Sequence, residues 1–337
     1  MVQGESRSLD DARVLITGIS GFVGSHLAEH LLAKHPGARI FGFLRWRSPD
    51  RNIRGLLREP RVTFLFGDLL DETSLRHALA QADPHFIFHL AAQSYVPYSY
   101  RAPRVTLDVN GVGTSNLLEA VRAQRDRTKT DPVVHVCSSS EVYGQPRPED
   151  VPIRESHPLR PISPYGVSKV TEDLLGLNYW ISDRVKTIRT RMFTHTGPRR
   201  GEVFAESAFA KQIVEIEKGK IEPVIRVGNL DSVRTFADVR DAVEAYRLLV
   251  LKCTYGEVYN IGGDRTMTIG ELLELLIARS KLAKRPEVRV DPQLLRPSDV
   301  TLQIPDCSRF VAETGWRPTY SFERTIDDSL EYLRSVL

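Results

Sequence analysis

The amino-acid sequence predicts an α/β fold: a doubly wound parallel sheet with a smaller C-terminal lobe. Three observations support this prediction. Short apolar runs alternate with segments of helical periodicity from residue 13 to about residue 195, as expected for parallel strands joined by right-handed helical crossovers. A turn with three glycines directly follows the first apolar run. Beyond Pro198 the alternation becomes less regular, which favours a separate lobe.

The predicted strands are the apolar runs, and the predicted helices are the periodic segments between them. The first run, 13–17, is followed at once by a helix expected over 22–33. Further strands are expected at 39–44, 62–66, 85–90 and 133–137, with a helix over 114–123. In the second part, helices are expected over 205–219 and 269–281, and the stretch 285–306, rich in Pro, Arg and Asp, is expected to be mostly loop.

Composition and charge exclude several classes of protein. The chain of 337 residues is long enough for one large domain or two closely joined ones. Its formal net charge of +3, with acidic and basic residues interleaved, gives no reason to expect a nucleic-acid partner. No apolar run approaches the roughly 20 residues that span a bilayer, so no membrane partner is expected. The polar N-terminus lacks the apolar stretch of a signal peptide, and residues 1–12 are expected to form a flexible tail.

The cysteines argue against a disulfide framework and against a zinc site. Cys137, Cys253 and Cys307 are odd in number and far apart in the sequence, and no Cys-x-x-Cys spacing occurs. We therefore expect no metal site, and three reduced thiols in a cytoplasmic protein.

The glycine turn indicates a dinucleotide cofactor. Gly18, Gly21 and Gly24 form a Gly-x-x-Gly-x-x-Gly pattern between the first strand and the first helix. Gly18 permits the tight turn, Gly21 lets the backbone approach a pyrophosphate, and Gly24 permits close packing of helix on strand. The N-terminus of the helix then faces the phosphates. An ordinary glycine-rich turn is the alternative, but its place on the first strand of an alternating pattern favours a Rossmann-like fold.

The end of the second predicted strand favours NADP(H) over NAD(H). An NAD-binding fold usually carries an acid there, which holds the ribose 2′-hydroxyl. This chain has Arg45 and Arg47 instead, and two guanidinium groups would attract a 2′-phosphate. The alternative is a solvated basic loop.

Two further turns complete the predicted cofactor site. Asp68, after the third strand, could hydrogen-bond the adenine, and the small side chains of Ala91 and Ala92 after the fourth strand let the backbone lie against the dinucleotide. The residues predicted to bind the cofactor from these turns are Gly18, Ser20, Gly21, Phe22, Val23, Gly24, Arg45, Arg47, Asp68, Leu69, Leu90, Ala91 and Ala92.

A tyrosine and a lysine four residues apart suggest proton transfer to an alcohol. On a helix, Tyr165 and Lys169 project from the same face. An ammonium favours the phenolate, so Lys169 is expected to lower the pKa of the Tyr165 phenol. Such a tyrosine can exchange a proton with a sugar hydroxyl near neutral pH, beside a nicotinamide. The alternative is a chance pair on a solvated helix.

Ser139 and Glu141 follow the strand expected at 133–137, where the carboxyl ends of parallel strands form a ligand crevice. A set of Ser, Tyr and Lys moves a proton and a hydride. Glu141 adds a carboxylate, which can remove a proton alpha to a newly formed ketone. The alternatives are that the Ser139 hydroxyl satisfies backbone groups at the strand end, and that Glu141 faces solvent or caps a helix.

Taken together, the glycine turn, the Ser139-Ser140-Glu141 run and the Tyr165-x-x-x-Lys169 pair resemble the extended short-chain dehydrogenase/reductase family. Within that family the chain is most similar to the GDP-mannose 4,6-dehydratases and the related GDP-6-deoxy-4-keto-mannose reductases. The segments 45–48 and 197–202 resemble the dehydratases, and the segments 209–213, 227–231, 236–241 and 296–300 resemble both.

This resemblance implies roles for individual residues. Ser139, Glu141, Tyr165 and Lys169 match catalytic positions, and Tyr165, Lys169, His195 and Arg200 match positions that line the cofactor. The substrate-binding set is Ser94, Ser99, Thr194, Lys211, Arg234, Arg296 and Asp299. Thr194 stands where the family usually has Asn. A threonine can donate one hydrogen bond to the substrate pyrophosphate but has no side-chain amide. For Arg234 the alternative is a surface ion pair with Asp231 or Asp238.

The activity implied is that of an NADP-dependent nucleotide-sugar 4,6-dehydratase. It would convert GDP-mannose to GDP-4-keto-6-deoxy-mannose by C4 oxidation, loss of water across C5 and C6, and return of the hydride. Three alternatives stay open: an NADPH-consuming reductase of the 4-keto-6-deoxy sugar, a nucleotide-sugar epimerase, and a non-catalytic NADP(H)-binding regulator.

The resemblance also suggests how the chain is divided and assembled. We expect a flexible tail over 1–12, an NADP-binding domain over 13–197 with a return segment near 234–262, and a substrate-binding lobe over 198–233 and 263–337. The expected partner is a GDP-linked sugar nucleotide. Relatives commonly pair through helices of the NADP-binding domain, so a homodimer is expected, and the Arg199-Arg200 segment suggests a homotetramer.

Overall fold

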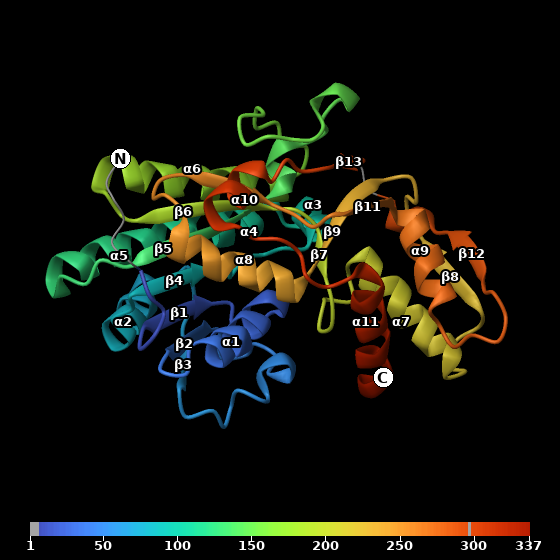
Figure 1. Ribbon diagram of the computed structural model, residues 1–337, viewed down its shortest axis with the longest axis horizontal. Helices are drawn as coiled ribbons and strands as arrows, with labels where there is room; N and C mark the ends of the chain where they lie inside the picture. Colours follow the sequence, from blue (N-terminus) through green and yellow to red (C-terminus); the bar gives the residue numbers. More distant parts are fainter. Residues whose placement is uncertain (1–6, 296–297) are drawn as a thin grey trace.

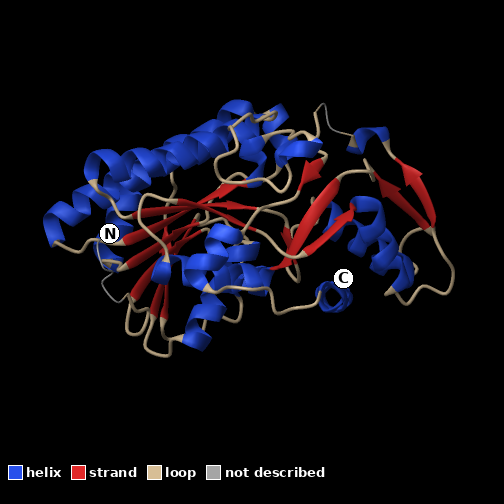
Figure 2. Cartoon of the chain, turned by 45° about the horizontal axis from the view of Figure 1, so that its top comes forward, coloured by secondary structure: helices blue, strands red, loops and turns tan. Residues whose placement is uncertain are grey.

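The computed structural model describes residues 7–295 and 298–337. Its larger part is a seven-stranded parallel sheet with helices on both faces (Figures 1 and 2). The strand order is β10-β6-β5-β4-β1-β2-β3. The strands are β1 (Arg13–Thr17), β2 (Arg39–Leu44), β3 (Val62–Phe66), β4 (Phe86–His89), β5 (Val133–Ser139), β6 (Thr187–Met192) and β10 (Val258–Ile261). This arrangement confirms the predicted doubly wound fold.

Alternating side chains of the strands supply two separate cores. In β1, Val14 and Ile16 belong to one cluster of buried residues and Leu15 belongs to the other. The first cluster is covered by α1 (Phe22–Lys34) and α8 (Val239–Lys252), and the second by α2 (Glu72–Ala82) and α5 (Gly113–Thr128). A sheet that is buried on both faces must have apolar residues at successive positions, which explains why these strands are continuous apolar runs.

The remaining helices of this domain include the one that carries Tyr165 and Lys169. The long helix α6 (Pro164–Asp183) packs against β5 and β6. Between β4 and α5 the chain forms the short helices α3 (Val96–Arg101) and α4 (Pro103–Leu107) and a π-helical turn, η2 (Asp108–Val112). Short 3-10 turns in this domain are η1 (Arg51–Ile53), η3 (Ser140–Tyr143) and η4 (Pro148–Asp150). A further 3-10 turn, η5 (Pro292–Leu294), lies in the second part of the chain.

The smaller lobe has its own sheets and its own core. Its strands are β7 (His195–Thr196), β8 (Val224–Val227), β9 (Val233–Asp238), β11 (Arg265–Thr268), β12 (Glu287–Val290) and β13 (Leu302–Gln303). Strand β9 pairs with β11, β13 and β7, whereas β8 pairs with β12. The helices are α7 (Ala205–Glu217), α9 (Ile269–Ala278) and α11 (Phe322–Val336). They enclose a third apolar cluster that includes Phe209, Leu272 and Ile326.

The structure moves three boundaries of the expected division. Leu9 is only 1% exposed, and the Arg7 guanidinium donates to the Val250 and Cys253 carbonyls, so residues 7–12 are packed and not a flexible tail. Strand β9 pairs within the lobe, so the return to the large sheet starts with α8. Helix α10 (Ser308–Thr314) packs against β10 and α8, because Phe310 joins the first core.

Most predicted elements are present with small changes at their ends. Strands 13–17, 39–44 and 62–66 have the predicted bounds, and the helix expected over 114–123 extends over 113–128. The expected loop at 285–306 is wrong in part, because it contains β12 and β13. Strand β12 forms by pairing in parallel with β8, Glu287 opposite Val224, and that long-range contact is invisible in a local Pro- and Arg-rich sequence.

Two further findings concern the described residues as a whole. Within 7–295 and 298–337, no helix combines the length and the apolar character needed to cross a membrane. The three cysteines are free thiols.

Candidate active site

Around the glycine turn, the backbone approaches its neighbours very closely. Gly18 has φ = +73°, and a Cβ at this position would lie 2.9 Å from the Cα of Ala91. A Cβ at Gly24 would lie 2.4 Å from the Gly18 carbonyl oxygen. The turn after β1 and the loop after β4 are therefore in contact, at the point where the strand order reverses. In open α/β sheets this reversal is where ligands bind.

A buried threonine joins these two segments. The Oγ1 of Thr17 accepts hydrogen bonds from the backbone N–H of Leu90 and of Ala91, both at 3.1 Å. Its own hydrogen faces the Nδ1 of His89 at 2.9 Å, and the Nε2–H of His89 donates to Thr114 Oγ1 at 2.9 Å. Burial lowers the pKa of His89 to about 3, so the ring is neutral, as this tautomer requires. Sequence reasoning did not assign Thr17 or His89 to the site, since neither residue belongs to the glycine pattern.

Asn110, on the π-helical turn η2, connects the loop after β4 to α6. Its Oδ1 accepts from the Gln93 N–H at 2.8 Å, and its Nδ2 donates to the Gln93 carbonyl at 3.0 Å and to Ser168 Oγ at 2.8 Å. Ser168 in turn donates to the Tyr165 carbonyl at 2.7 Å. The cofactor side of the crevice is thus tied to the helix that carries Tyr165. The π-helical turn was not predicted, because its backbone geometry has no simple sequence signature.

The two arginines after β2 are exposed at the carboxyl edge of the sheet. Arg45 and Arg47 form no ion pair within the described part of the chain, and the Arg47 guanidinium lies 5.0 Å from the ring centre of Trp46. Leu44 pairs with Phe66 in the register of β2 and β3, which brings the loop containing Asp68 alongside. Asp68 is exposed and accepts from the Leu70 N–H at 3.0 Å.

The four predicted catalytic residues lie together at the ends of β5 and α6. Ser139 is the last residue of β5, and its Oγ accepts from the Glu141 N–H at 3.2 Å. Its side chain also lies near the Tyr165 phenol and lowers the pKa of that phenol. A Cβ at Gly166 would lie 2.9 Å from the Glu141 carbonyl oxygen, so the first turn of α6 packs directly against η3. Ser139 therefore satisfies a backbone N–H and contacts the phenol as well.

The electrostatic setting of Tyr165 differs from the sequence expectation. Burial raises the pKa of its phenol, and this exceeds the lowering by the Lys169 ammonium and by the Ser139 hydrogen bond. The expectation was right about the sign of the lysine's effect and wrong about the net shift, because sequence cannot show that Tyr165 is only 8% exposed. Lys169 Nζ donates to the Cys137 carbonyl at 2.8 Å and to Glu172 Oε2 at 2.6 Å.

A glutamine from the far lobe reaches the Glu141 carboxylate. Gln303, on β13, donates from Nε2 to Glu141 Oε1 at 3.3 Å and is 3% exposed. Because β13 pairs with β9, with Gln303 opposite Arg234, the lobe places this amide over the end of β5. Sequence reasoning did not identify Gln303, which lies in the stretch expected to be a loop.

His195 and Arg200 lie between the two parts of the chain. The His195 ring stacks on Phe22, with 5.8 Å between ring centres and an interplanar angle of 9°. Its Nδ1 faces the Phe193 carbonyl at 3.1 Å, and its Nε2 is buried without a partner among the described residues. Burial, with Arg200 adding to it, lowers the pKa of His195 to about 3.

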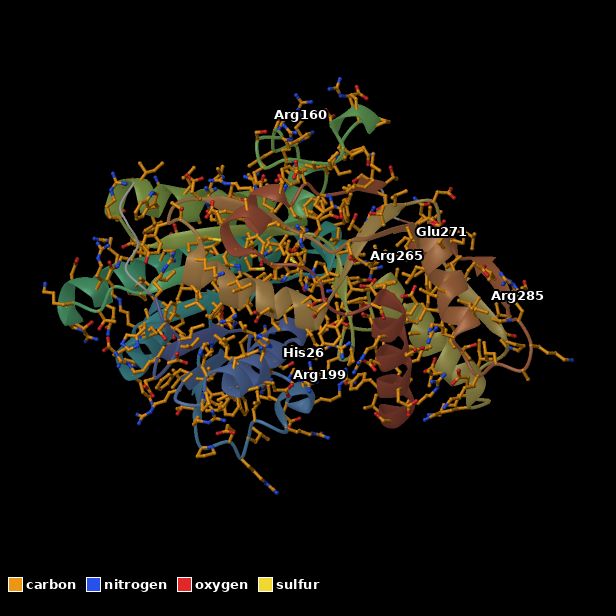
Figure 3. All side chains as sticks on the ribbon, viewed as in Figure 1. His26, Arg160, Arg199, Arg265, Glu271 and Arg285 are labelled. Atoms are coloured by element: carbon orange, nitrogen blue, oxygen red, sulfur yellow. The ribbon has the colours of Figure 1, made fainter. Side chains whose placement is uncertain are left out.

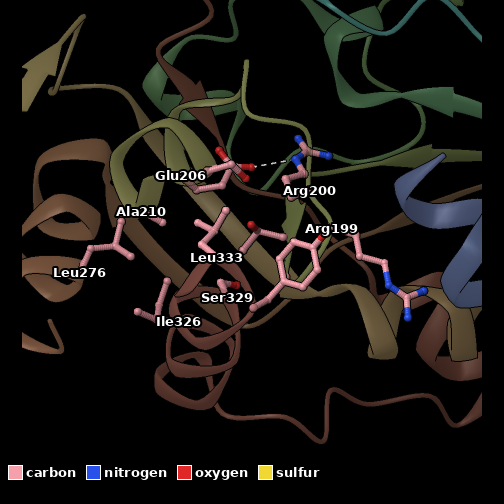
Figure 4. Close-up of a pocket in the computed structure, with 12 residues that line it drawn as sticks. Arg199, Arg200, Glu206, Ala210, Leu276, Ile326, Ser329 and Leu333 are labelled. Atoms are coloured by element: carbon pink, nitrogen blue, oxygen red, sulfur yellow. Dashed lines mark hydrogen bonds and ion pairs between the residues drawn. The ribbon is translucent and has the colours of Figure 1, made fainter. Parts of the chain in front are cut away.

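The loop after β7 is fixed to α1 and to α7. The His26 ring contacts the Pro198 carbonyl at 2.9 Å, and Arg199 pairs with Glu29 at 2.9 Å; Figure 3 labels His26 and Arg199 at this junction. Arg200 turns the other way and pairs with the largely buried Glu206 of α7 at 3.0 Å, at the edge of a small pocket (Figure 4). Arg200 is thus held at the boundary between the two parts.

The residues expected to bind substrate are only partly brought together. Arg234 Nη1 donates to the Val233 carbonyl at 3.0 Å, and its Nη2 lies 3.8 Å from Asp299, so the expected alternatives, Asp231 and Asp238, are not its ion-pair partner. Asp299 accepts from Ser232 at 3.0 Å.

Other members of that set lie apart or are already engaged. Thr194 lies between β6 and β7, where its carbonyl accepts from the Ala237 N–H at 3.0 Å, and Ser94 is exposed. Ser99 is fully buried and donates to the Val96 carbonyl at 2.6 Å, so its hydroxyl is used within its own helix. Lys211 pairs with Glu202 at 2.8 Å. Arg296 lies outside the described residues.

These features fit a dinucleotide. Gly21, the N-cap of α1, makes no side-chain cap hydrogen bond, which leaves N–H groups of the first turn available for a phosphate. Gly18, Gly21 and Gly24 carry no side chain that could block a close approach. The His195 ring, whose buried Nε2 has no partner among the described residues, stacks on Phe22 at the start of the same helix. The arrangement can hold a pyrophosphate at the glycine turn and a reacting alcohol beside Ser139 and Tyr165.

A doubly wound sheet with this turn on its first strand, and with a buried Tyr–Lys pair on the helix after β5, defines a class: the chain is an extended short-chain dehydrogenase/reductase. A family model described as GDP-mannose 4,6 dehydratase matches residues 15–329, so the protein belongs to the GDP-mannose 4,6-dehydratase family.

Individual relatives agree with this assignment. The chain is 34% identical over 325 residues to a GDP-6-deoxy-D-mannose reductase of Pseudomonas aeruginosa, covering 96% of each chain. It is 32% identical over 346 residues to a GDP-mannose 4,6-dehydratase of Yersinia enterocolitica, covering 92% of this chain and 91% of the relative. A solved structure, RMD from Pseudomonas aeruginosa complexed with NADPH, is similar with a TM-score of 0.81 and 30% identity, over 97% of this chain and 100% of that one.

We predict that Thr17→Val destabilises the protein by about 2 kcal/mol, because two backbone N–H groups and the His89 Nδ1 lose their partner while the side-chain shape is kept. Urea unfolding monitored by circular dichroism measures the change. Thr17→Ser is the matched control: it keeps the hydroxyl and loses only a methyl group, worth about 0.8 kcal/mol. Equal stability of the two variants would show that the hydroxyl is not needed.

Proposed function

We propose that the protein is an NADP-dependent GDP-mannose 4,6-dehydratase, a lyase that forms GDP-4-keto-6-deoxy-mannose and water. The observation that supports this proposal best is the position of Glu141. Its backbone packs against the first turn of the helix that carries Tyr165, and its carboxylate is held by Gln303. A carboxylate at that position gives the site a second proton acceptor, which elimination requires and simple oxidation does not.

The proposed roles follow from the geometry. Tyr165 takes the proton of the C4 hydroxyl, assisted by the neighbouring Ser139 hydroxyl, which lowers the pKa of the phenol. The 4-ketone acidifies the C5 proton, which Glu141 removes, and water leaves from C6 with proton donation by Glu141 or Ser139. The Gln303 amide donates a hydrogen bond to the Glu141 carboxylate and helps to fix its position.

NADP(H), when bound, would supply the hydride acceptor for C4 and the hydride donor for C6, so the overall reaction is redox-neutral. The glycine turn and the N-terminus of α1 would hold its pyrophosphate, and Lys169 its nicotinamide ribose. His195 and Arg200 would line the same space. Arg234 and Asp299, which are held together on β9 and the segment before β13, would take the nucleotide part of a GDP-sugar.

A second candidate is a reductase that consumes NADPH and reduces the 4-keto-6-deoxy sugar. The relative that favours it is named GDP-6-deoxy-D-mannose reductase and is 34% identical to this chain. The same Ser139, Tyr165 and Lys169 would serve, whereas Glu141 would have no proton to remove. An epimerase would also use Ser139, Tyr165 and Lys169, and it would release no water.

The first prediction on this activity concerns Glu141. Glu141→Gln keeps the shape and loses the base, so turnover of GDP-mannose with catalytic NADP⁺ should fall by a factor of about 100 or more. Mass spectrometry of the product measures it: the dehydratase loses one water, the reductase adds two hydrogens to a 4-keto sugar, and the epimerase changes no mass.

Tyr165→Phe is the companion variant for the same assay. It should lose activity on GDP-mannose to a similar degree, because the proton of the C4 hydroxyl then has no acceptor. Full turnover by Glu141→Gln with loss of turnover by Tyr165→Phe would show that Glu141 is not the base that removes the C5 proton. Stoichiometric loss of NADPH with a 4-keto-6-deoxy sugar nucleotide would favour the reductase. Unchanged turnover by both would reject a catalytic role for the site.

A further prediction concerns the choice of cofactor. If Arg45 and Arg47 hold a 2′-phosphate, the double variant Arg45→Ala/Arg47→Ala should bind NADPH about tenfold or more weakly, since charge-assisted hydrogen bonds are lost. NADH lacks that phosphate, so its affinity should stay the same. Fluorescence titration with each cofactor measures the ratio. Equal losses for NADPH and NADH would contradict a role in 2′-phosphate binding.

We also propose that the protein forms a homodimer through α6. Val167, Leu174 and Ile181 are seven residues apart in sequence, and their exposed fractions are 43%, 47% and 58%. This spacing puts them on one helix face, and such an apolar stripe is typical of a contact surface. Leu174→Glu should convert the dimer to a monomer in light scattering, whereas Leu57→Glu, the same change at an exposed leucine outside α6, should leave the dimer intact. A wild-type monomer would reject the proposal.

A further inference from the structure

Lys169 is paired with an acid that the proposed chemistry does not use. Glu172 lies one turn further along α6, and its Oε2 accepts from Lys169 Nζ at 2.6 Å. The side chains of Lys169 and Glu172 are 6% and 1% exposed. A charged carboxylate is almost never buried to this degree without a specific partner, and here the partner is a predicted catalytic lysine.

Among the described residues, Lys169 has no second counter-charge of its own. Its second acceptor is the Cys137 carbonyl at 2.8 Å, which is neutral. Asp173, the next residue after Glu172, is fully buried, but it is held by Arg189 at 2.6 Å and by Arg191 at 2.8 Å. The carboxylate that balances the ammonium of Lys169 is therefore Glu172.

Other ionisable groups around the pair are neutral or already compensated. Burial lowers the pKa of His89 and of His135 to about 3 and raises the pKa of the Cys137 thiol. The groups that face the pair are Tyr165 and Asp173 on α6, His135 and Cys137 on β5, His89 on β4 and, through Cys137 and Tyr165, Tyr246 on α8.

We propose that Glu172 is a positioning residue: its carboxylate is the counter-ion that keeps the buried Lys169 protonated and fixes its ammonium beside Tyr165. The inference rests on the proposed role of Lys169 in holding the nicotinamide ribose. Burial by itself lowers the pKa of a lysine, because it disfavours the charged form. In this site burial does so, but Glu172 and the groups beside it raise the pKa of Lys169 above its usual value.

Without the charge of Glu172, burial should therefore lower the pKa of Lys169. In Glu172→Gln the amide can still accept a hydrogen bond, but the ammonium has lost its counter-ion and releases its proton at a lower pH. Above that pH the ribose loses a charged donor and Tyr165 loses the ammonium that lowers its pKa. Both cofactor affinity and turnover should then decline on the alkaline side.

Burial raises the pKa of Glu172 to about 7, so the test is a fluorescence titration with NADPH between about pH 8 and pH 10, where the carboxylate is ionised. An ordinary lysine titrates near the upper limit of that range. The wild type should keep a constant dissociation constant across it. Glu172→Gln should lose affinity by about tenfold at the alkaline end, the effect of one charge-assisted hydrogen bond. Glu172→Asp, which keeps the charge, should follow the wild type.

The matched control is Glu72→Gln, the same change in an exposed ion pair with Arg76 on α2. It should not alter the pH profile. A purely structural role for Glu172 would lower the melting temperature of Glu172→Gln and leave the shape of its pH profile unchanged, and that result would overturn the proposal. If Glu172→Gln does not fold, the wild type decides: loss of NADPH affinity with a midpoint below about pH 9 would show that Lys169 is not held in its charged form.

The titration needs no sugar nucleotide, so it is independent of the proposed reaction. A wild type that is inactive on GDP-mannose, together with alkaline loss of NADPH affinity in Glu172→Gln, would reject the proposed function and keep the role of Glu172. The reverse combination would keep the dehydratase and reject the counter-ion.

Discussion

The contact between the turn after β1 and the loop after β4 is the constraint on which the rest of the site depends. A Cβ on Gly18 would lie 2.9 Å from the Cα of Ala91, so these backbones can meet only because Gly18 has none. The Thr17 hydroxyl stabilises this contact by accepting hydrogen bonds from two backbone N–H groups of the loop. From there Asn110 ties the loop to α6, and with it to Tyr165. Cofactor contacts and catalytic side chains thus share one continuous hydrogen-bonded frame.

Burial sets the protonation of this site more than any single charge does. It holds His89 and His195 neutral and raises the pKa of the Tyr165 phenol against the pull of Lys169. A site of this kind cannot rely on one ammonium to activate a tyrosine. It needs a lysine that stays charged while buried, and Glu172 is placed to provide that condition. In this arrangement Tyr165 transfers the proton, whereas Lys169 and Glu172 determine the pH range in which it can do so.

The second part of the chain contributes side chains next to the proposed base and to the proposed nucleotide site. Strand β13 brings Gln303 to the Glu141 carboxylate, and β9 brings Arg234 next to Asp299. Both strands belong to a small sheet that is packed on its own core, so the lobe can differ between relatives while the sheet that holds the cofactor stays the same. This division agrees with a family in which similar chains are named dehydratase and reductase.

The sequence by itself determined the doubly wound sheet, the bounds of β1, β2 and β3, the glycine turn and the set of Ser139, Glu141, Tyr165 and Lys169. These features are local: an apolar run, a glycine pattern or an i, i+4 spacing is visible within a few residues. The family resemblance also predicted Ser99 and Lys211 as substrate ligands. In the structure Ser99 is buried and bonded within its own helix, and Lys211 is paired with Glu202.

Only the tertiary structure decided the features that depend on distant segments. Thr17 meets His89 across 72 positions, Gln303 meets Glu141 across 162, and β12 forms because β8 lies beside it. The sign of the Tyr165 pKa shift belongs here too, since it follows from burial, which no spacing reveals. The role of Glu172 also depends on tertiary packing, although it is only three positions from Lys169 in the sequence. Packing leaves its side chain 1% exposed, whereas an exposed pair of the same residues would contribute little to stability.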